Sequence, residues 1–172
     1  MTNHLYNGDL PDGLDLGPVV AIDCETMGLN PHRDRLCLVQ LSAGDGSCHL
    51  VKFGRDNFDA PNLKAQLADP GRMKIMQYAR FDLAVIEKYL GVMSTPVYCT
   101  KIASKLVRTF TDRHGLKVLL SELLDVDVSK QQQTSDWGAE TLTQAQLAYA
   151  ADDVLYLHAL REELLQRLAR EG

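Results

Sequence analysis

The sequence has few aromatic residues, no excess of basic residues and no long hydrophobic run. Aromatic residues make up 6% of the 172 residues, and 18 Lys and Arg stand against 23 Asp and Glu, for a net charge of −5. This charge argues against non-specific binding to long nucleic acid, because such binding grows with the number of phosphates that a protein neutralises. No apolar run reaches the length of a membrane span, and the N-terminus lacks the basic and apolar regions of a secretory signal. We therefore expect a cytoplasmic protein with no membrane partner.

Cysteine is also sparse, and the four cysteines form no Cys-x-x-Cys pair. Three of them lie within apolar or β-like runs, which is typical of small core residues in a reducing compartment. We therefore expect Cys24, Cys37, Cys48 and Cys99 to be neither zinc ligands nor partners in disulfides.

The length and the balance of residues indicate one globular domain of ordinary size. Hydrophobic residues make up 45% and charged residues 24% of the chain, and no repeat or linker divides it. We expect a single domain over residues 1–172, in which residues 1–15 are a loose lead-in because Gly, Asp, Pro and Asn are frequent there. One short edge strand near Leu5 and Tyr6 is the regular structure expected in this lead-in.

The hydrophobic pattern changes period along the chain. Strands come first, then strands alternate with helices, and helices follow to the end, which predicts an α/β fold with a mixed sheet of about five strands flanked by helices. The Asp-Gly pair at residues 45–46 predicts a hairpin between two of the strands. The expected elements are strands from residue 19 and over 35–41, 47–53, 74–78 and 97–99, and helices over 61–67, 81–90, 101–109, 116–124 and 144 to the C-terminus, with a break near Ala151.

Two acids directly follow the apolar strand that begins at Val19. Side chains two residues apart on a strand point to the same face, so Asp23 and Glu25 are expected side by side at its carboxyl end. Like charges this close raise each other's pKa unless a cation neutralises them, and a hard divalent ion such as Mg²⁺ or Mn²⁺ suits oxygen ligands. An Asp-x-Glu after an apolar run is common, however, so the motif needs further acids to indicate a metal site.

Two more acids stand where sheet topology brings them toward this pair. Asp82 begins the helix that follows the strand at residues 74–78, and loops at the carboxyl ends of neighbouring strands share one crevice. Asp153 is four residues after Tyr149, so on a helix the two share a face, whereas Asp152 points elsewhere. Taken singly, Asp82 also fits an acid placed by the helix dipole, and Asp153 a solvated helix residue.

In this order the residues resemble the tyrosine-containing branch of the DEDD superfamily of 3′-5′ exonucleases. Its three motifs match Asp23-Cys24-Glu25, residues 77–82 and residues 149–153. Residues 99–103 and 130–137 extend the resemblance to the ribonuclease D-like family, and residues 31–36 and 109–117 to nanoRNase C of alphaproteobacteria, a group of short relatives within it. Gln77 stands where the broad family often has Asn.

The resemblance implies an RNase H-like fold, a lone exonuclease domain without the helical HRDC domains of ribonuclease D, and hydrolysis with two Mg²⁺ or Mn²⁺ ions per site. Asp23 would bridge both ions, Glu25 and Asp153 would hold the ion on the nucleophile side, and Asp82 would hold the other, mainly through water. Tyr149 would orient the attacking water and assist its deprotonation, although a phenol with a pKa of about 10 is a poor base and acidification by the ions would dominate. The implied substrates are very short RNAs, especially dinucleotides cut to nucleoside 5′-monophosphates, and the implied assembly is a homo-octamer.

Substrate contacts are expected from four segments: the turn after the first acids, the region around the second motif, the basic stretch around residues 113–114 and the polar loop before the last helix. Leu29 fits either a wedge between bases or a core residue, and Trp137 either a stacking platform or a core anchor. Lys101, Lys105 and Arg108 share a helix face and Lys117 follows, which fits phosphate binding, a solvated face or a subunit contact. The full set expected to bind substrate is Thr26, Met27, Gly28, Leu29, Phe81, Arg113, His114, Lys130, Gln133, Ser135 and Trp137.

Three other functions remain open at this point. An exonuclease of the ribonuclease D type would trim longer RNA or DNA, a haloacid-dehalogenase-type phosphatase would use Asp23 as nucleophile, and a non-catalytic scaffold would use the fold for binding alone. The phosphatase has no role for Tyr149. The scaffold has no reason to keep an acidic cluster that destabilises a site without ions.

Overall fold

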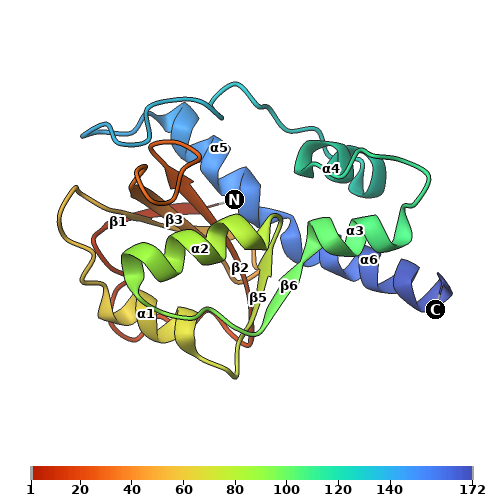
Figure 1. The fold of residues 1–172 in the computed structure, drawn as a ribbon, viewed down its shortest axis with the longest axis horizontal. Helices are drawn as coiled ribbons and strands as arrows, with labels where there is room; N and C mark the ends of the chain where they lie inside the picture. The colour runs from red at the N-terminus through yellow and green to blue at the C-terminus, as the bar shows by residue number, and fades with distance from the viewer. Residues whose placement is uncertain (1, 172) are drawn as a thin grey trace.

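A six-stranded mixed sheet organises the chain in the computed structural model, which describes residues 2–171 (Figure 1). The strand order across the sheet is β1-β4-β3-β2-β5-β6. The strands are β1 (Thr2–Asn7), β2 (Val19–Thr26), β3 (Leu36–Ser42), β4 (Ser47–Lys52), β5 (Met73–Met76) and β6 (Val97–Cys99). The helices are α1 (Pro61–Ala68), α2 (Ala79–Leu90), α3 (Thr100–Val107), α4 (Leu116–Leu124), α5 (Gln144–Leu155) and α6 (Leu157–Glu171).

The pairing of the strands confirms the α/β prediction and extends it. β2, β3 and β4 form the expected antiparallel series, while β5 pairs parallel with β2, and β6 pairs parallel with β5. The edge strand expected near Leu5 and Tyr6 is confirmed as β1, which runs for six residues parallel to β4 and is the sixth strand of the sheet. The lead-in is therefore loose only after Asn7, where the structure shows turns and bends up to Pro18.

Each face of the sheet packs against its own helices (Figure 1). Val20 and Ile22 of β2 face the core that α1 and α2 complete, whereas Ala21 belongs to the core beneath α5 and α6. Because side chains alternate along a strand, Asp23 and Glu25 lie on the same face as Ala21. The acids of β2 are thus turned toward α5.

Local sequence accounts for where the helices begin and end. Gly91 ends α2 with a φ of 69°, a left-handed conformation that glycine adopts without strain. Thr143 and Gln146 form a capping box at the start of α5. The break in the last helical segment lies at Tyr156, five residues after the expected position at Ala151, and α2 begins two residues earlier than expected.

The cysteine prediction is confirmed for residues 24, 37 and 48, which are buried, and all four cysteines are free. Cys99 is only partly buried, at the end of β6. Within residues 2–171, no helix combines the length and the apolar character that crossing a membrane requires.

Candidate active site

Three carboxylates meet between the end of β2 and helix α5. One oxygen of Asp23, one of Glu25 and one of Asp153 all lie within 4.8 Å of one another. The two acids of β2 share a face because they are two residues apart, and α5 packs over that face and presents Asp153 to them. The sequence predicted this convergence of distant acids, and the geometry brings them together.

The electrostatics of this trio show why it requires a cation. Burial raises the pKa of Asp23 to about 6. Burial and then the charges of Asp23 and Glu25 raise the pKa of Asp153 to about 11, and burial followed by the Asp23 charge raises the pKa of Glu25 well above its usual range. Clustered carboxylate oxygens that repel each other in a partly buried site suit a hard divalent cation. The donor set therefore fits Mg²⁺ or Mn²⁺.

The fourth acid, Asp82, approaches Asp23 from the other side. It lies in the first turn of α2, is 2% exposed and accepts a hydrogen bond from the backbone N–H of Cys24. Burial, followed by the nearby Asp23 charge, raises the pKa of its carboxyl group well above the usual range. Asp82 thus places a fourth carboxyl group next to Asp23, although it is not one of the residues that line the open cavity.

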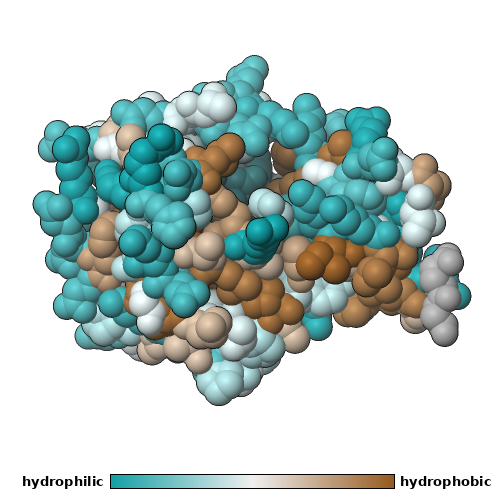
Figure 2. Space-filling view, viewed as in Figure 1, coloured by the Kyte–Doolittle hydropathy of each residue, from teal (hydrophilic) through white to brown (hydrophobic). Residues whose placement is uncertain are grey.

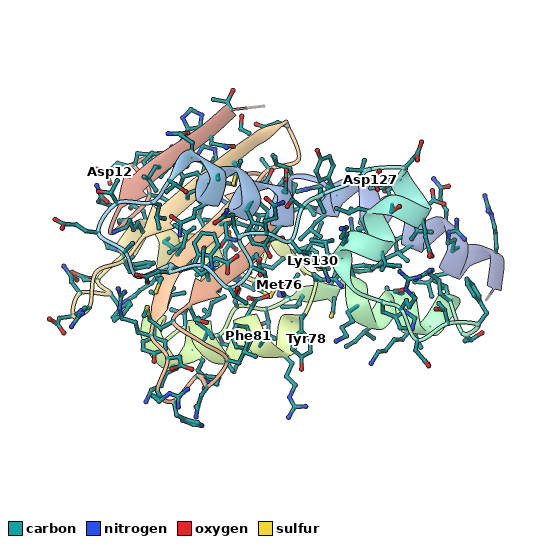
Figure 3. All side chains as sticks on the ribbon, turned by 90° about the horizontal axis from the view of Figure 1, so that it is seen from above. Asp12, Met76, Tyr78, Phe81, Asp127 and Lys130 are labelled. Atoms are coloured by element: carbon teal, nitrogen blue, oxygen red, sulfur yellow. The ribbon has the colours of Figure 1, made fainter. Side chains whose placement is uncertain are left out.

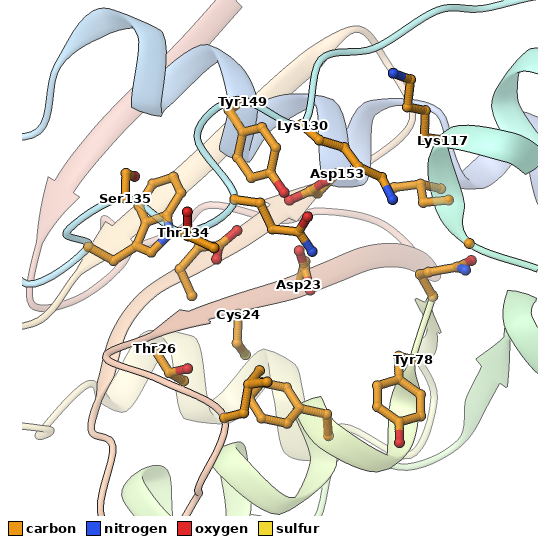
Figure 4. A pocket seen from close by; sticks show the side chains of 18 of the residues that line it. Asp23, Cys24, Thr26, Tyr78, Lys117, Lys130, Thr134, Ser135, Tyr149 and Asp153 are labelled. Carbon is orange, nitrogen blue, oxygen red and sulfur yellow. The ribbon is translucent and has the colours of Figure 1, made fainter.

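Tyr149 lies one helical turn before Asp153 on α5. Figure 4 shows its hydroxyl pointing toward the Asp153 carboxylate. Burial, and after it the charges of Asp153, Glu25 and Asp23, raise the pKa of the phenol. The hydroxyl is therefore protonated at neutral pH and can form hydrogen bonds beside the carboxylates.

A cavity of about 570 Å³ opens beside the carboxylates (Figure 4). Its volume lies within the range of roughly 300–1,000 Å³ that is usual for small-ligand sites. Figure 3 shows Tyr78 and Phe81 at the start of α2 and Lys130 on the segment after α4. The predicted substrate contacts that line the cavity are Thr26, Met27, Gly28, Leu29, Phe81, Lys130, Gln133, Ser135 and Trp137.

The turn after β2 presents Leu29 to the solvent. Asp34 organises this turn, because its carboxylate accepts from the backbone N–H of Asn30 at 3.0 Å. A Cβ atom at Gly28 would collide with the Asp34 carboxylate, so glycine permits the close turn. Leu29 is 87% exposed at the cavity, which excludes the alternative of a core residue.

Helix α5 also holds the loop that carries Lys130 to Trp137. The Gln146 Nε2 donates to Ser135 Oγ at 3.1 Å and to the Asp136 carbonyl at 3.0 Å. Trp137 is 2% exposed, and its ring centroid is 5.9 Å from that of Tyr149. Trp137 is therefore a core anchor that supports Tyr149, and the alternative of an open stacking platform is wrong.

Two predicted substrate contacts, Arg113 and His114, do not line the cavity. His114 is buried, with its Nδ1 2.7 Å from Ser104 Oγ and its carbonyl accepting from Gln77 Nε2 at 2.8 Å. Arg113 is exposed, and its carbonyl accepts from Arg108 at 2.8 Å. The segment between α3 and α4 folds back onto α3, so His114 packs against α3, and the substrate contact expected of Arg113 stays a prediction.

The basic face predicted for residues 101–108 is divided by the fold. Lys101 lines the cavity, with its Nζ 4.3 Å from the centroid of the Tyr78 ring, and Lys117 lines it from α4. Lys105 is exposed but is not among the lining residues. Arg108 is buried and pairs with Glu122, so it is unavailable to a phosphate.

Sequence reasoning missed Tyr78 and Thr134, which line the cavity, and Gln40, which lies beneath the acids. Gln40 Nε2 donates to Glu25 Oε1 at 3.2 Å. The available signal was its place as a polar residue in the otherwise apolar run of residues 36–41. A polar side chain at such a position requires a buried partner.

Comparison with known proteins places this site among nucleases. A family model described as 3′-5′ exonuclease matches residues 9–169. The structure of Brucella melitensis NrnC bound to pGG is similar to the whole chain at 56% identity, with a TM-score of 0.96 over 84% of that chain. The structure of the same protein with bound Mg²⁺ has 55% identity and a TM-score of 0.95.

Ribonuclease D proteins are more distant relatives. Ribonuclease D of Acidiphilium cryptum is 34% identical over 95% of this chain, which corresponds to 41% of that protein. The crystal structure of Escherichia coli RNase D, 27% identical, matches 90% of this chain and 40% of that one with a TM-score of 0.77, so the sheet and helices have the RNase H-like exonuclease fold. The chain spans about two fifths of the length of these relatives.

Proposed function

Because this chain belongs to the 3′-5′ exonuclease family, we propose that it is a metal-dependent exoribonuclease that hydrolyses very short RNAs, especially dinucleotides, to nucleoside 5′-monophosphates. The observation that carries this proposal is the convergence of Asp23, Glu25 and Asp153 beside a cavity that Tyr149 and Leu29 also line. The similarity to an NrnC structure that contains pGG, a phosphorylated dinucleotide, supports a short substrate.

The metal requirement follows from the charges of the site. Two divalent ions, Mg²⁺ or Mn²⁺, would be held by Asp23 with Glu25 and Asp153 on one side and by Asp23 with Asp82 on the other. Bound ions of this kind supply charge stabilisation at a phosphate and an acidified water at neutral pH. The Mg²⁺ found in the similar NrnC structure supports this assignment.

The remaining chemistry is assigned to side chains of the cavity. Tyr149 orients the attacking water through its hydroxyl, which the raised pKa keeps protonated. Lys130 reaches over the opening and offers positive charge to a phosphate (Figure 4). Leu29 faces the bases, where its exposed side chain separates the two nucleosides of a dinucleotide.

Preference for a dinucleotide is tested by comparing hydrolysis of pGG with that of a twenty-residue RNA that has the same 3′ end. We expect the rate per 3′ end to be at least ~10-fold higher for the dinucleotide, because the cavity of about 570 Å³, which two loops and α4 help to line, has the size of a site for a small ligand. Equal rates, or a faster reaction with the longer RNA or with DNA, would favour the ribonuclease D-like alternative, which the 34% identity to a ribonuclease D supports.

Chelation distinguishes the enzyme from the non-catalytic alternative. Hydrolysis should stop when a chelator removes divalent ions and resume when Mg²⁺ or Mn²⁺ is restored. Failure to cut any oligonucleotide in the presence of either ion would favour a binding scaffold.

We also propose that the single domain assembles with copies of itself, as an octamer. Figure 2 shows a hydrophobic area over α3, where Ile102, Leu106 and Phe110 are each exposed by more than half. Contiguous exposed apolar side chains of this kind are typical of interfaces. Light scattering of the purified protein tests the assembly, and Leu106→Asp should reduce the molar mass.

A further inference from the structure

Gln40 lies at the centre of β3, on the face of the sheet that carries the acids. Its Cα is paired directly with that of Asp23 in the antiparallel ladder, so the two side chains point the same way. The side chain is 0% exposed, enclosed between the sheet and α5. It cannot reach the solvent, and its hydrogen bonds must be made inside the protein.

The amide nitrogen of Gln40 has three acceptors around it. They are Glu25 Oε1 at 3.2 Å, Asp23 Oδ2 at 3.4 Å and the Ala150 carbonyl at 3.3 Å. The opposite orientation of the amide is excluded, because it would place Oε1 against two carboxylates and a carbonyl. One NH₂ group thus contacts both acids of β2 and the backbone of α5.

This arrangement joins the two elements that build the site. Ala150 follows Tyr149 directly and precedes Asp153 by three residues, so its carbonyl belongs to the turn of α5 that presents both side chains. The amide therefore sets the distance between the β2 acids and that turn. It also contacts one oxygen of each acid of β2.

Stability of the fold alone does not explain a glutamine at position 40. Its Oε1 has no hydrogen-bond partner among the described residues. A buried polar atom without a partner destabilises the folded state, and an apolar residue of similar size would fill the same space without that penalty. Such a local conflict is expected at functional sites.

We propose that Gln40 is a positioning residue for the metal site, which holds Asp23 and Glu25 in ligating orientation and in register with Tyr149 and Asp153. The identity of the ion rests on the proposed function, whereas the role of Gln40 rests on the hydrogen bonds above. Groups that hold metal ligands in this way typically change metal affinity by about 10–100-fold when removed.

The test is Mg²⁺ binding by Gln40→Met, measured by calorimetry without substrate. Methionine keeps the length and volume of glutamine but has no N–H donor. We expect the dissociation constant for Mg²⁺ to rise by about 10–100-fold. We also expect the Mg²⁺ concentration for half-maximal hydrolysis to rise in parallel, with a smaller change in KM for pGG at saturating Mg²⁺.

Gln66 provides the matched control. It is a buried glutamine on α1, on the other face of the sheet, where its Nε2 donates to the Leu14 carbonyl at 2.7 Å and its Oε1 is also unpartnered. Gln66→Met removes the same chemical group and should change thermal stability without changing Mg²⁺ affinity. If both variants lose affinity equally, the effect is one of general stability and the proposal is wrong.

A second variant covers the case in which Gln40→Met does not fold. Gln40→Asn keeps a buried amide but withdraws it by one methylene, so its contacts with the acids are lost while polarity is retained. The rise in melting temperature on adding Mg²⁺ should be smaller for this variant than for the parent protein. An unchanged rise, or unchanged Mg²⁺ affinity in folded Gln40→Met, overturns the proposal.

These measurements separate the inference from the function itself. If the parent protein binds Mg²⁺ but cuts no oligonucleotide, the proposed function fails while the calorimetric comparison still tests Gln40. If the parent hydrolyses pGG and Gln40→Met binds Mg²⁺ normally, the function stands and the inference fails.

Discussion

Two partly buried polar clusters in this molecule are built in opposite ways. The acid cluster, formed by Asp23, Glu25, Asp82 and Asp153, gathers like charges, and none of the ion pairs among the described residues involves them. The arginine network beneath α4 gives its polar groups partners. Arg108 pairs with Glu122, Ser104 contacts the His114 ring, and the Gln77 amide donates to the His114 carbonyl.

This difference in hydrogen bonding and ion pairing indicates which cluster has a structural role and which has a functional one. A satisfied polar network stabilises a particular arrangement of chain segments and needs nothing from outside. A cluster of carboxylates with raised pKa values is stable only when protons or cations neutralise it. Within one domain, the unsatisfied cluster is therefore the one to which we assign chemistry, and the satisfied one holds the segment between α3 and α4 in place.

The largest expected effect comes from Asp23→Asn, which removes an acid that adjoins both Asp82 and Asp153. Hydrolysis of pGG should fall at least ~10³-fold, because the charge that holds the ions is reduced. The metal-free protein should become more stable, because one repelling charge is gone. Circular dichroism melting checks the fold, and a variant that still cuts at a tenth of the parent rate would contradict the assignment.

The next effect in size is that of Tyr149→Phe, which removes only a hydroxyl. We expect the turnover number to fall about 10²-fold, with Mg²⁺ affinity unchanged, because the phenol orients water and does not ligate an ion. Steady-state kinetics and calorimetry measure the two quantities. Loss of Mg²⁺ affinity would show that the hydroxyl belongs to the ion site instead.

In the arginine network, Arg108→Met should reduce the free energy of unfolding and leave the turnover number unchanged. Removal of the buried guanidinium breaks its bonds to Glu122 and to the Arg113 carbonyl, and we expect the free energy of unfolding to fall by about 2–3 kcal/mol. Urea unfolding measures the loss, with exposed Lys105→Met as the control that changes it little. If the turnover number of Arg108→Met fell as much as that of Tyr149→Phe, the arginine network would also contribute to the reaction and the two clusters would not differ in role.

The smallest expected effect is the pH dependence of the metal-free protein. The pKa of Asp23 is raised to about 6 in the folded state. A raised pKa means that the folded state holds the proton more tightly, so its stabilising contribution is complete below the unfolded pKa and is lost as the pH rises through about 6.

We therefore expect the melting temperature without metal to fall by about 3 °C or more between about pH 5 and about pH 8. Saturating Mg²⁺ should remove most of this fall, because the ion replaces the proton. Calorimetric melting measures both curves. A flat profile without metal would contradict the raised pKa values of Asp23 and Asp153.

Much of the site could be predicted because local rules apply to it. The spacing of Asp23 and Glu25 on a strand, and of Tyr149 and Asp153 on a helix, determines which side chains share a face. The helix expected over residues 116–124 likewise coincides with α4, Leu116–Leu124. The order of the three motifs then indicated that these faces meet.

The errors have a different origin. His114 carries a ring typical of a ligand contact, and only the return of the chain onto α3 brings it to Ser104 and buries it. Gln40 has no motif around it, and its partners are 15, 17 and 110 residues away. Trp137 is buried because Gln146 ties the preceding residues of its loop to α5.

The sequence by itself determined the family, the order of the strands and helices, and which acids face the same side of each element, because periodicity and motif order act over short stretches of chain. The tertiary structure decided which polar residues are satisfied and which are not. Partners such as Ala150 for Gln40 or Glu122 for Arg108 become neighbours only when strands pair and helices pack, and no local rule specifies those contacts.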